Sequence, residues 1–318
     1  GLASIHNVAI NNTAGVELLT ATTVNGTLSL VNGPLTTNDT LTINFDNGGN
    51  VREDVTDNGS IIGKVKGRRD VVAKTHYIAA PFSGSTSLQV AQTTPIWVSP
   101  YWKMYTRVFA SQNWSAIRNY TTAMPLGEGF SVSFVTAAPL ILSGTYDATF
   151  TLTGTSYSNA AAGKFMLVGN PYPSTLDWDN GAGWTKTNVG DAIYFWDAAN
   201  QRTGSYVAGV GTNGGTQYIP AMQSFLVATT GVGGLNSSVS INNSARTAAS
   251  QSYWRTASND QLVKLVVKTA TGLVDETVVR FDDVASDVFE ADADAYKIMN
   301  GFIPSLYTKT ATDATNYS

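Results

Sequence analysis

The sequence predicts an all-β protein, and three features lead to that prediction. Charged residues make up 13% of the 318 residues, about half of the usual share. Short stretches such as residues 130–135 and 148–152 alternate between apolar and polar side chains, which is typical of half-buried strands. No stretch has the long period of about 3.6 residues that marks a capped amphipathic helix. We expect short β-solenoid (β-helix) rungs followed by antiparallel β-sandwich domains.

The chain is expected to divide into three regions. Residues 1–75 should form a solenoid-like repeat region, residues 76–247 an antiparallel β-sandwich, and residues 248–318 a second, incomplete sandwich-like region. Hydrophobic residues amount to 43% of the chain, which is enough to fill several cores. The chain opens in mid-pattern and stops without a finishing strand, so we interpret it as a portion of a longer protein.

A short internal repeat supports the solenoid-like region. Residues 25–30 (NGTLSL) recur 13 positions later as residues 38–43 (NDTLTI). One such unit cannot bury its own apolar face, so copies should stack on one another. Two stacked pairs are expected, Leu28 on Leu41 and Leu30 on Ile43. The last rung should run over about residues 61–72, and an ordinary β-meander with similar turns is the alternative.

Residues 169–173 (GNPYP) should form a rigid corner. Each proline fixes its own φ and restricts the residue before it. Gly169 can adopt backbone conformations that are closed to other residues. The corner should follow a strand over residues 165–168, and Tyr172 should serve as a packing anchor.

Four aromatic residues of the second region are candidates for contact with a glycan: Trp178, Trp184, Tyr194 and Trp196. Aromatic faces stack on the apolar faces of sugar rings, and neighbouring aspartates accept hydrogen bonds from sugar hydroxyls. The aspartates close by in sequence are Asp177, Asp179, Asp191 and Asp197. The alternative is that the rings fill the cores of the sandwich. Because successive strand residues point to opposite faces, residues 194–196 cannot all point inward.

An acidic stretch of the third region is a candidate calcium site. Ca²⁺ prefers several oxygen ligands, which carboxylates supply. The candidate ligands are Asp282, Asp283, Asp287, Asp292 and Asp294. The stretch lacks the glycine and the terminal glutamate of an EF-hand loop, and a solvated acidic loop is the alternative.

Few features of the sequence point to catalysis, and we expect no enzyme. The two histidines, His6 and His76, are far apart in the chain, and neither a Gly-x-Ser-x-Gly nor an HExxH motif is present. The absence of cysteine excludes thiol catalysis and disulfides. A net charge of −4 without a basic stripe argues against nucleic-acid binding. No apolar run is long enough to span a bilayer, and calcium is the only cofactor considered.

Four segments, taken in order, resemble a known group of bacterial proteins. They are residues 124–130 (MPLGEGF), 167–178 (LVGNPYPSTLDW), 193–197 (IYFWD) and 219–227 (IPAMQSFLV). Their order resembles a region near the C-terminus of large surface proteins of the Bacteroidota. Those proteins leave the cell through the type IX secretion system and include gliding-motility adhesins. The resemblance implies an extracellular or outer cell-surface location, with the type IX secretion machinery as a partner, and it implies no reaction.

The expected function is that of a non-catalytic structural or adhesive region of a large secreted or cell-surface protein. The alternatives are a carbohydrate-binding module of a secreted enzyme and a subunit of a self-assembling extracellular filament or surface layer. Besides the secretion machinery, the partners considered are a surface polysaccharide and further copies of the chain. An exposed aromatic groove would favour the first alternative, and large apolar contacts between copies would favour the second.

One modification is expected, an O-linked glycan on Thr40. Residues 39–41 (DTL) resemble the Asp-Thr-aliphatic acceptor that Bacteroidota use to glycosylate exported proteins. Thr40 follows a polar turn at the edge of an expected rung, where a bulky solvated group can stay outside the core. The triplet is short, and an Asp39 that only shapes the turn is the alternative.

Overall fold

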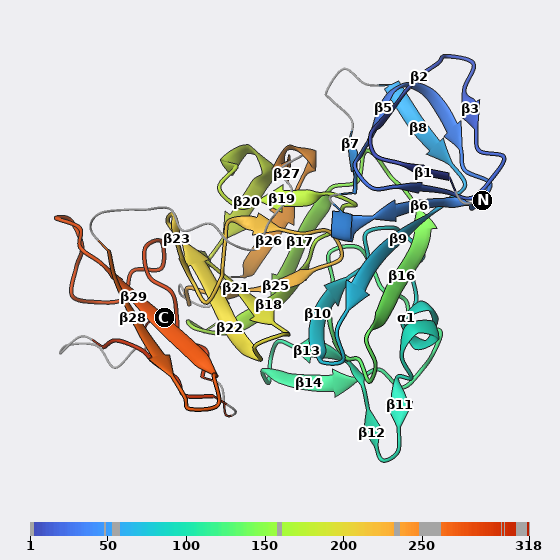
Figure 1. Cartoon of the computed structure of the whole chain (residues 1–318). Coiled ribbons are helices and arrows are strands. Elements are labelled where there is room, and N and C mark those ends of the chain that lie inside the picture. The colour runs from blue at the N-terminus through green and yellow to red at the C-terminus, as the bar shows by residue number, and fades with distance from the viewer. Residues whose placement is uncertain are drawn as a thin grey trace.

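The computed structural model describes residues 3–47, 49–52, 58–157, 161–231, 236–247, 262–299, 301, 303–309 and 317. Over these residues the chain is all-β, with several antiparallel sheets and one short α-helix, α1 (Ser87–Thr93) (Figure 1). Three 3₁₀ turns complete the regular structure: η1 (Phe45–Asn47), η2 (Gly181–Gly183) and η3 (Asn243–Ala245). In the described part of the chain, no helix is both long and apolar enough to cross a membrane.

The N-terminal part consists of two parallel ladders that share a core. The first contains β1 (Ala3–Ile5), β4 (Thr22–Val24), β6 (Leu41–Asn44) and β9 (Lys64–Val71). In the second, β5 (Thr27–Thr36) pairs on one side with β2 (Val8–Asn11) and β3 (Val16–Glu17), and on the other with β7 (Asn50–Arg52) and β8 (Asn58–Ile62). Alternate side chains of each strand point inward. The buried ones include Ile10, Val24, Leu28, Leu30, Leu35, Leu41, Ile43, Val51 and Val65.

The stacking predicted from the 13-residue repeat is wrong. Leu28 lies on β5 and Leu41 on β6, which belong to different ladders, so neither this pair nor Leu30 and Ile43 are strand neighbours. Within the first ladder, Thr22 pairs with Leu41, 19 positions further on. The two similar segments lie in different ladders that share one core, and alternation alone does not show which ladder a segment joins. The strands expected over residues 61–72 are present as the end of β8 and as β9.

A row of polar side chains runs across the first ladder. Asn25 Nδ2 donates to Ser4 Oγ (2.7 Å), and Asn44 Nδ2 donates to Asn25 Oδ1 (2.8 Å). Arg68 Nη1 then donates to Asn44 Oδ1 (3.2 Å). A shift of one residue in any strand would turn its side chains to the other face and break this row. The row therefore helps to fix the parallel register.

Strand β9 joins the ladders to the antiparallel part of the molecule. On its other edge β9 pairs with β16 (Ala138–Thr145), which is antiparallel to it along its whole length. Two aromatic side chains from beyond residue 75, Phe82 and Tyr146, are buried in the core of the ladders. The predicted boundary between residues 75 and 76 stays a prediction, but both backbone hydrogen bonds and the apolar core extend across it.

The first antiparallel sheet packs beside this joint. Its order is β10 (Thr75–Ala79), β15 (Gly129–Ser133), β13 (Met104–Val108) and β14 (Asn113–Ala116). Helix α1 lies against β16 and buries Val90, but its N-cap residue Thr86, which precedes the helix, makes no side-chain capping bond. Because the helix is short and uncapped, the sequence does not predict it. A separate hairpin, β11 (Trp97–Val98) and β12 (Tyr101–Trp102), projects from this sheet (Figure 1).

The second half of the expected sandwich region contains three further antiparallel sheets. One has the order β18 (Phe165–Gly169), β25 (Ser224–Thr229), β21 (Val189–Asp197), β22 (Arg202–Val207) and β23 (Val210–Thr212). The others are β17 (Leu152–Tyr157), β26 (Ser237–Ile241) and β20 (Trp184–Thr187), and β24 (Tyr218–Ile219), β19 (Thr175–Asp177) and β27 (Arg246–Thr247). Inward side chains of all three share one core, which gives a sandwich-like arrangement. That core includes Leu152, Val168, Leu176, Ile193, Phe225 and Val239.

The predicted corner at residues 169–173 is confirmed, and a buried asparagine holds it. Asn170 follows β18 and is fully buried, and its Oδ1 accepts the backbone N–H of Tyr172 (2.9 Å). Its Nδ2 lies 2.8–3.1 Å from three main-chain carbonyl oxygens, those of Ser174, Ile219 and Pro220. Tyr172 is buried as the predicted anchor, and its hydroxyl donates to the carbonyl of Phe150 (2.7 Å). The amide of Asn170 therefore ties the corner to the segment that precedes β25.

The described part of the third region contains one two-stranded sheet. Strands β28 (Leu262–Lys268) and β29 (Val274–Arg280) form a hairpin that lies beside β22 and β23. Arg202 Nη1 donates to the carbonyl of Val274 (3.0 Å), and Asn213 Nδ2 donates to Asp275 Oδ1 (2.7 Å). Polar side chains of the antiparallel part thus hold the start of β29.

Two neighbouring glycines give a matched test of close packing at η2. A Cβ added to Gly183 would lie 2.3 Å from the backbone N of Ala245, whereas a Cβ on Gly181 would meet no atom within 4 Å. Gly183→Ala should lower the free energy of unfolding by about 2–4 kcal/mol, because backbone would have to move. Gly181→Ala should change it by less than about 1 kcal/mol. Urea unfolding of both variants checks the prediction, and equal stability would contradict it.

Candidate functional site

Three of the four predicted glycan-contact residues are buried in the protein. Trp178 and Trp184 lie in the sandwich core with ring centroids 4.7 Å apart, and each indole N–H donates to a main-chain carbonyl, of Asp191 and Asp177 respectively. Tyr194 is buried beneath the third region, and its hydroxyl accepts the backbone N–H of Tyr296 (2.8 Å). Their aromatic faces are covered by protein, so the core-packing alternative describes these three residues.

Trp196 differs from the other three candidates because it is only half-buried. It lies at the end of β21, stacks on Tyr77 at a ring-centroid distance of 6.1 Å, and donates its indole N–H to the carbonyl of Thr75 (2.9 Å). These contacts fix the ring in one orientation. Burial raises the pKa of Tyr77 to about 12, so this neighbour stays uncharged at neutral pH.

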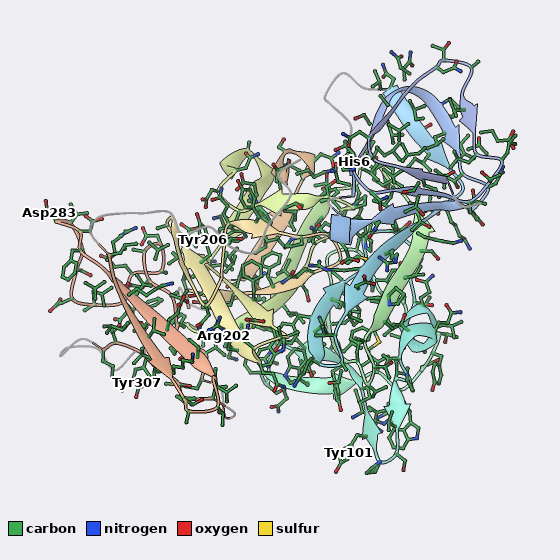
Figure 2. The ribbon with its side chains drawn as sticks, in the orientation of Figure 1. His6, Tyr101, Arg202, Tyr206, Asp283 and Tyr307 are labelled. Carbon is green, nitrogen blue, oxygen red and sulfur yellow. The ribbon has the colours of Figure 1, made fainter. Side chains whose placement is uncertain are left out.

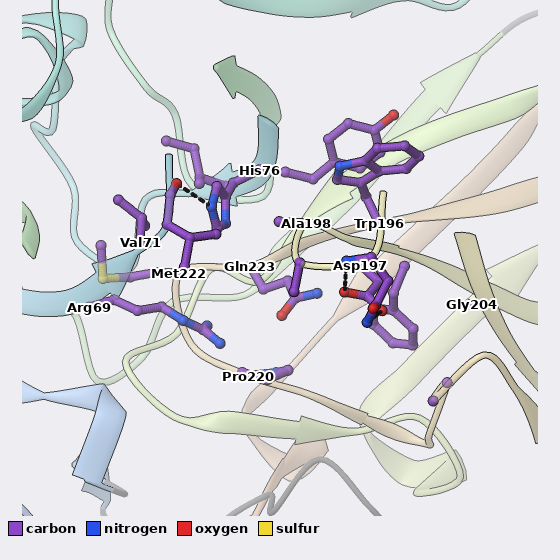
Figure 3. A pocket seen from close by; sticks show the side chains of 18 of the residues that line it. Arg69, Val71, His76, Trp196, Asp197, Ala198, Gly204, Pro220, Met222 and Gln223 are labelled. Carbon is purple, nitrogen blue, oxygen red and sulfur yellow. Dashed lines mark hydrogen bonds between the residues drawn. The ribbon is translucent and has the colours of Figure 1, made fainter. Parts of the chain in front are cut away.

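Trp196 lines a cavity of about 530 Å³ between the two antiparallel halves (Figure 3). One wall comes from the end of β9 and from β10, and the other from the β21–β22 turn and residues 213–223. Apolar surface is supplied by Val71, Ile78, Phe195, Pro220 and Met222. This volume falls within the range of about 300–1,000 Å³ that is usual for small-molecule sites.

Positively charged, negatively charged and neutral polar side chains line this cavity. Figure 3 shows the amide of Gln223 between Arg69 and Asp197. Arg69 Nη1 donates to the carbonyl of Ala221 (2.7 Å), and Asp197 accepts from Arg202 Nε (3.4 Å). The side-chain amide of Gln223 makes no hydrogen bond to any residue that the structure describes. Amide, guanidinium and carboxylate groups together can donate to and accept from a polyhydroxylated ligand.

His76 also lines this cavity. Its Nε2 is 3.0 Å from the carbonyl oxygen of Val72, and its ring packs edge-on against Phe134. Burial lowers the pKa of His76, with a smaller contribution from the charge of Arg69, so the ring is neutral at pH 7. His6 belongs to the turn between β1 and β2, and the structure does not bring the two histidines together.

The structure does not assemble the predicted calcium ligands. Asp282, Asp283, Asp287, Asp292 and Asp294 all lie in described turns after β29. Across the described ranges, no three His, Cys, Asp or Glu side chains come close enough to hold a metal ion. Asp282 instead pairs with Arg280 (3.6 Å), and Asp294 accepts the backbone N–H of Glu290 (2.8 Å). The solvated-loop alternative fits this geometry better than a calcium site does.

Thr40 lies at the predicted turn, and its side chain is half-buried. Its hydroxyl is 2.7 Å from the carbonyl oxygen of Thr37 and 3.3 Å from that of Thr20. Asn38 and Asp39 adopt positive φ and form an exposed turn just before it. A glycan on Oγ1 would replace the proton that makes these hydrogen bonds, at a cost of about 1 kcal/mol.

The residues that complete the cavity lie far apart in the sequence. Arg69 lies near the end of β9, Gln223 precedes β25, and Trp196 is the last residue but one of β21. Residues 213–216 (NGGT) are typical of a loop, but this composition does not indicate which strands the loop approaches. The antiparallel bridge between Ile78 of β10 and Gln223, together with the course of β21, brings these side chains around one space.

Comparisons with known proteins add no family to this description. No family model, no curated protein and no solved structure matches the chain.

Proposed function

We propose that this chain is a non-catalytic structural and adhesive region of a large secreted or cell-surface bacterial protein. The observation that carries the proposal is strand β9, which pairs with β6 of the parallel ladder and with β16 of the antiparallel part. Regions of one chain usually move relative to one another unless a large apolar interface joins them. Here backbone hydrogen bonds, Phe82 and Tyr146 join them, so the ladders serve as a rigid spacer.

The ladders are proposed to be turns of a short β-solenoid. Support comes from strictly parallel pairing in both ladders, from the 19-residue spacing between Thr22 and Leu41, and from the polar row through Asn25 and Asn44. In a solenoid each turn contacts only its neighbours, so the number of turns sets the length of the spacer. A spacer of this kind holds a binding surface away from the cell.

The proposed location is the outer cell surface or the medium, with export by the type IX secretion machinery. The support is the resemblance of residues 167–178 and 219–227 to surface proteins of the Bacteroidota. O-glycosylation at Thr40 belongs to the same proposal. Mass analysis of native protein should show a glycan on the peptide that contains Thr40, and an unmodified peptide from surface-exposed protein would contradict the site.

A localisation experiment tests the main proposal. Antibodies against the chain should label intact cells of the source organism, and protease added outside the cells should remove the label. Purified protein should show no hydrolysis of esters, peptides or polysaccharides above background. Labelling only after the cells are broken would contradict the location, and turnover abolished by replacing a single carboxylate would contradict the non-catalytic role.

The cavity at Trp196 favours a second candidate, a carbohydrate-binding module. Its half-exposed indole matches the apolar face of a sugar ring, and the side-chain amide of Gln223, which has no hydrogen-bond partner among the described residues, matches the rim of hydroxyls. Gln223→Ala should weaken binding of a polysaccharide fragment by about tenfold, since one polar contact is worth about 1–1.5 kcal/mol. Gln92→Ala, an exposed glutamine on α1, should bind like the wild type. Calorimetry decides, and equal affinities would remove the cavity as the site.

The filament alternative rests on strand β28. Three of its apolar side chains, Val263, Leu265 and Val266, are 42–56% exposed. Among the described residues β28 pairs only with β29, so no described strand covers its other edge, and such an edge can accept a further strand. Sedimentation of the purified chain as a monomer at high concentration would contradict self-assembly through this edge.

A further inference from the structure

The β11–β12 hairpin forms an aromatic projection, and its side chains belong to none of the hydrophobic cores of the described residues. It extends away from the first antiparallel sheet, and Tyr101 lies at its far end (Figure 2). Tyr101 is 65% exposed, and Trp97 and Val98 are each about 40% exposed. We name residues 97–102 the aromatic finger. An exposed cluster of large apolar side chains on a small projection marks a site of interaction.

Both faces of the aromatic finger are apolar. Trp97 is directly opposite Trp102, and Val98 is directly opposite Tyr101. Directly opposite residues share one face of a hairpin, and successive residues point to opposite faces. The indole rings, 4.7 Å apart, therefore cover one face, and Val98 and Tyr101 cover the other. Stacking on a sugar ring uses one aromatic face. A hairpin that is apolar on both faces instead suits an environment that contacts it from all sides, such as the interface of a lipid bilayer.

Two cations lie at the base of the aromatic finger. The antiparallel register of β13 and β14 continues past the strands, because Ile117 N donates to Met104 O (2.9 Å). Lys103 precedes Met104 and Arg118 follows Ile117, so the two residues lie on the same side of this backbone contact. Neither cation pairs with an acidic side chain in the described parts of the chain, and Lys103 Nζ lies 5.7 Å from the ring centre of Tyr101. Two cations at the base of the finger attract an anion.

The charge of the surrounding segment has the same sign. Residues 71–127 contain four Lys and Arg residues and no Asp or Glu, although the whole chain has a net charge of −4. The four are Lys74, Lys103, Arg107 and Arg118. A basic segment of this kind in an acidic protein is complementary to an anionic surface.

We propose that the aromatic finger inserts into the headgroup region of an anionic lipid bilayer, with Lys103 and Arg118 over the lipid phosphates. Trp and Tyr side chains prefer this interface because their rings are apolar and their N–H and O–H groups remain hydrated. Basic residues next to the inserted rings add attraction to anionic lipids. The finger docks the molecule on a membrane from outside and spans nothing, and this inference is independent of the proposed function.

Vesicle co-sedimentation tests the proposal with the full chain. The protein should bind vesicles of phosphatidylcholine with phosphatidylglycerol, bind phosphatidylcholine alone more weakly, and dissociate as salt is raised. Trp97→Ala combined with Tyr101→Ala should lower partitioning about tenfold or more, since each inserted ring contributes strongly. Lys103→Gln and Arg118→Gln should each lower binding to anionic vesicles about fivefold while leaving the weak binding to neutral vesicles unchanged.

Tyr307→Ala is the matched control, because Tyr307 is 39% exposed and lies in a different part of the molecule (Figure 2). It should bind as the wild type does, and thermal unfolding should show that all variants are folded. If the double aromatic variant unfolds, the two charge variants still decide. The proposal is overturned by wild-type protein that ignores both kinds of vesicle, by equal loss of binding in Tyr307→Ala, or by binding to polygalacturonate without binding to vesicles.

Discussion

Replacing Asn170 by alanine is expected to lower the free energy of unfolding by about 4 kcal/mol, among the largest effects of any single change in this chain. The side-chain amide is fully buried, donates toward three carbonyl oxygens and accepts one backbone N–H. Alanine removes all four contacts at once. It also leaves buried backbone groups without partners, and each such group costs about 1–3 kcal/mol.

The control for Asn170 is an asparagine with a similar local role on the surface. Asn119 is exposed, and its Oδ1 accepts the backbone N–H of Thr121 (2.8 Å). Asn119→Ala should cost less than about 1 kcal/mol, because water replaces the lost acceptor. Urea unfolding at one pH compares the two variants, and Asn170→Asp adds a third measurement. If Asn170→Ala unfolds at the same urea concentration as Asn119→Ala, the corner does not depend on this amide.

The corner also illustrates what the sequence predicts well. Pro171 and Pro173 restrict their own backbone and that of the residues before them, so the corner follows from the residues themselves. Alternation over residues 130–135 likewise predicts β15, although four of its five residues are buried and not only those on one face. Local rules succeed where a few neighbouring residues determine the conformation.

The parallel ladders show where local rules fail. Residues 25–30 and 38–43 look like two copies of one unit, but they form two different walls around a common core. Both walls need an apolar residue at every second position, so alternation is the same in each. What separates them is the pairing partner. The partner of Leu41 is Thr22 in one direction and Val65 in the other, which depends on the length of the intervening turns.

The candidate cavity could not be derived from the sequence for a related reason. Four aromatic residues close together in sequence indicated a glycan site. Trp178 and Trp184 are buried in one core and Tyr194 in another, so of the four only Trp196 lines the cavity. The groups that would contact a ligand beside it, such as Gln223, come from segments that antiparallel pairing brings near. Side-chain type predicts the chemistry, whereas long-range pairing decides which side chains meet.

The buried ion pair in the third region carries the second large prediction. Lys297 Nζ and Asp275 Oδ1 are 2.7 Å apart, with side chains only 5% and 3% exposed. Asp275 also accepts Asn213 Nδ2 and the backbone N–H of Leu306, each at 2.7 Å. Burial alone would raise the pKa of Asp275, but these hydrogen bonds and the charge of Lys297 hold it below its usual value. The carboxylate is therefore ionised and paired at neutral pH.

Lys297→Met should destabilise the hairpin of β28 and β29 by about 3–5 kcal/mol at pH 7, because a buried carboxylate loses its counter-ion. Lys186→Met is the matched control: Lys186 also pairs with an aspartate at 2.7 Å, but its side chain is 25% exposed, so the cost should be below about 1 kcal/mol. Hydrogen exchange of the backbone amides of residues 274–280 reports the hairpin directly, separately from global unfolding.

The pH dependence of the same variant separates an electrostatic cause from a packing cause. A carboxyl group with a lowered pKa stabilises the folded state above its unfolded pKa of about 3.9, and this stabilisation is lost as the pH falls through the folded value. In Lys297→Met the pKa of Asp275 should rise, because burial then acts without the opposing cation. Protonation neutralises the unpaired carboxylate, so the difference in stability between wild type and variant should shrink from pH 7 toward about pH 3.5. A difference that is the same at both pH values would mean that Lys297 matters through its packing and not through its charge.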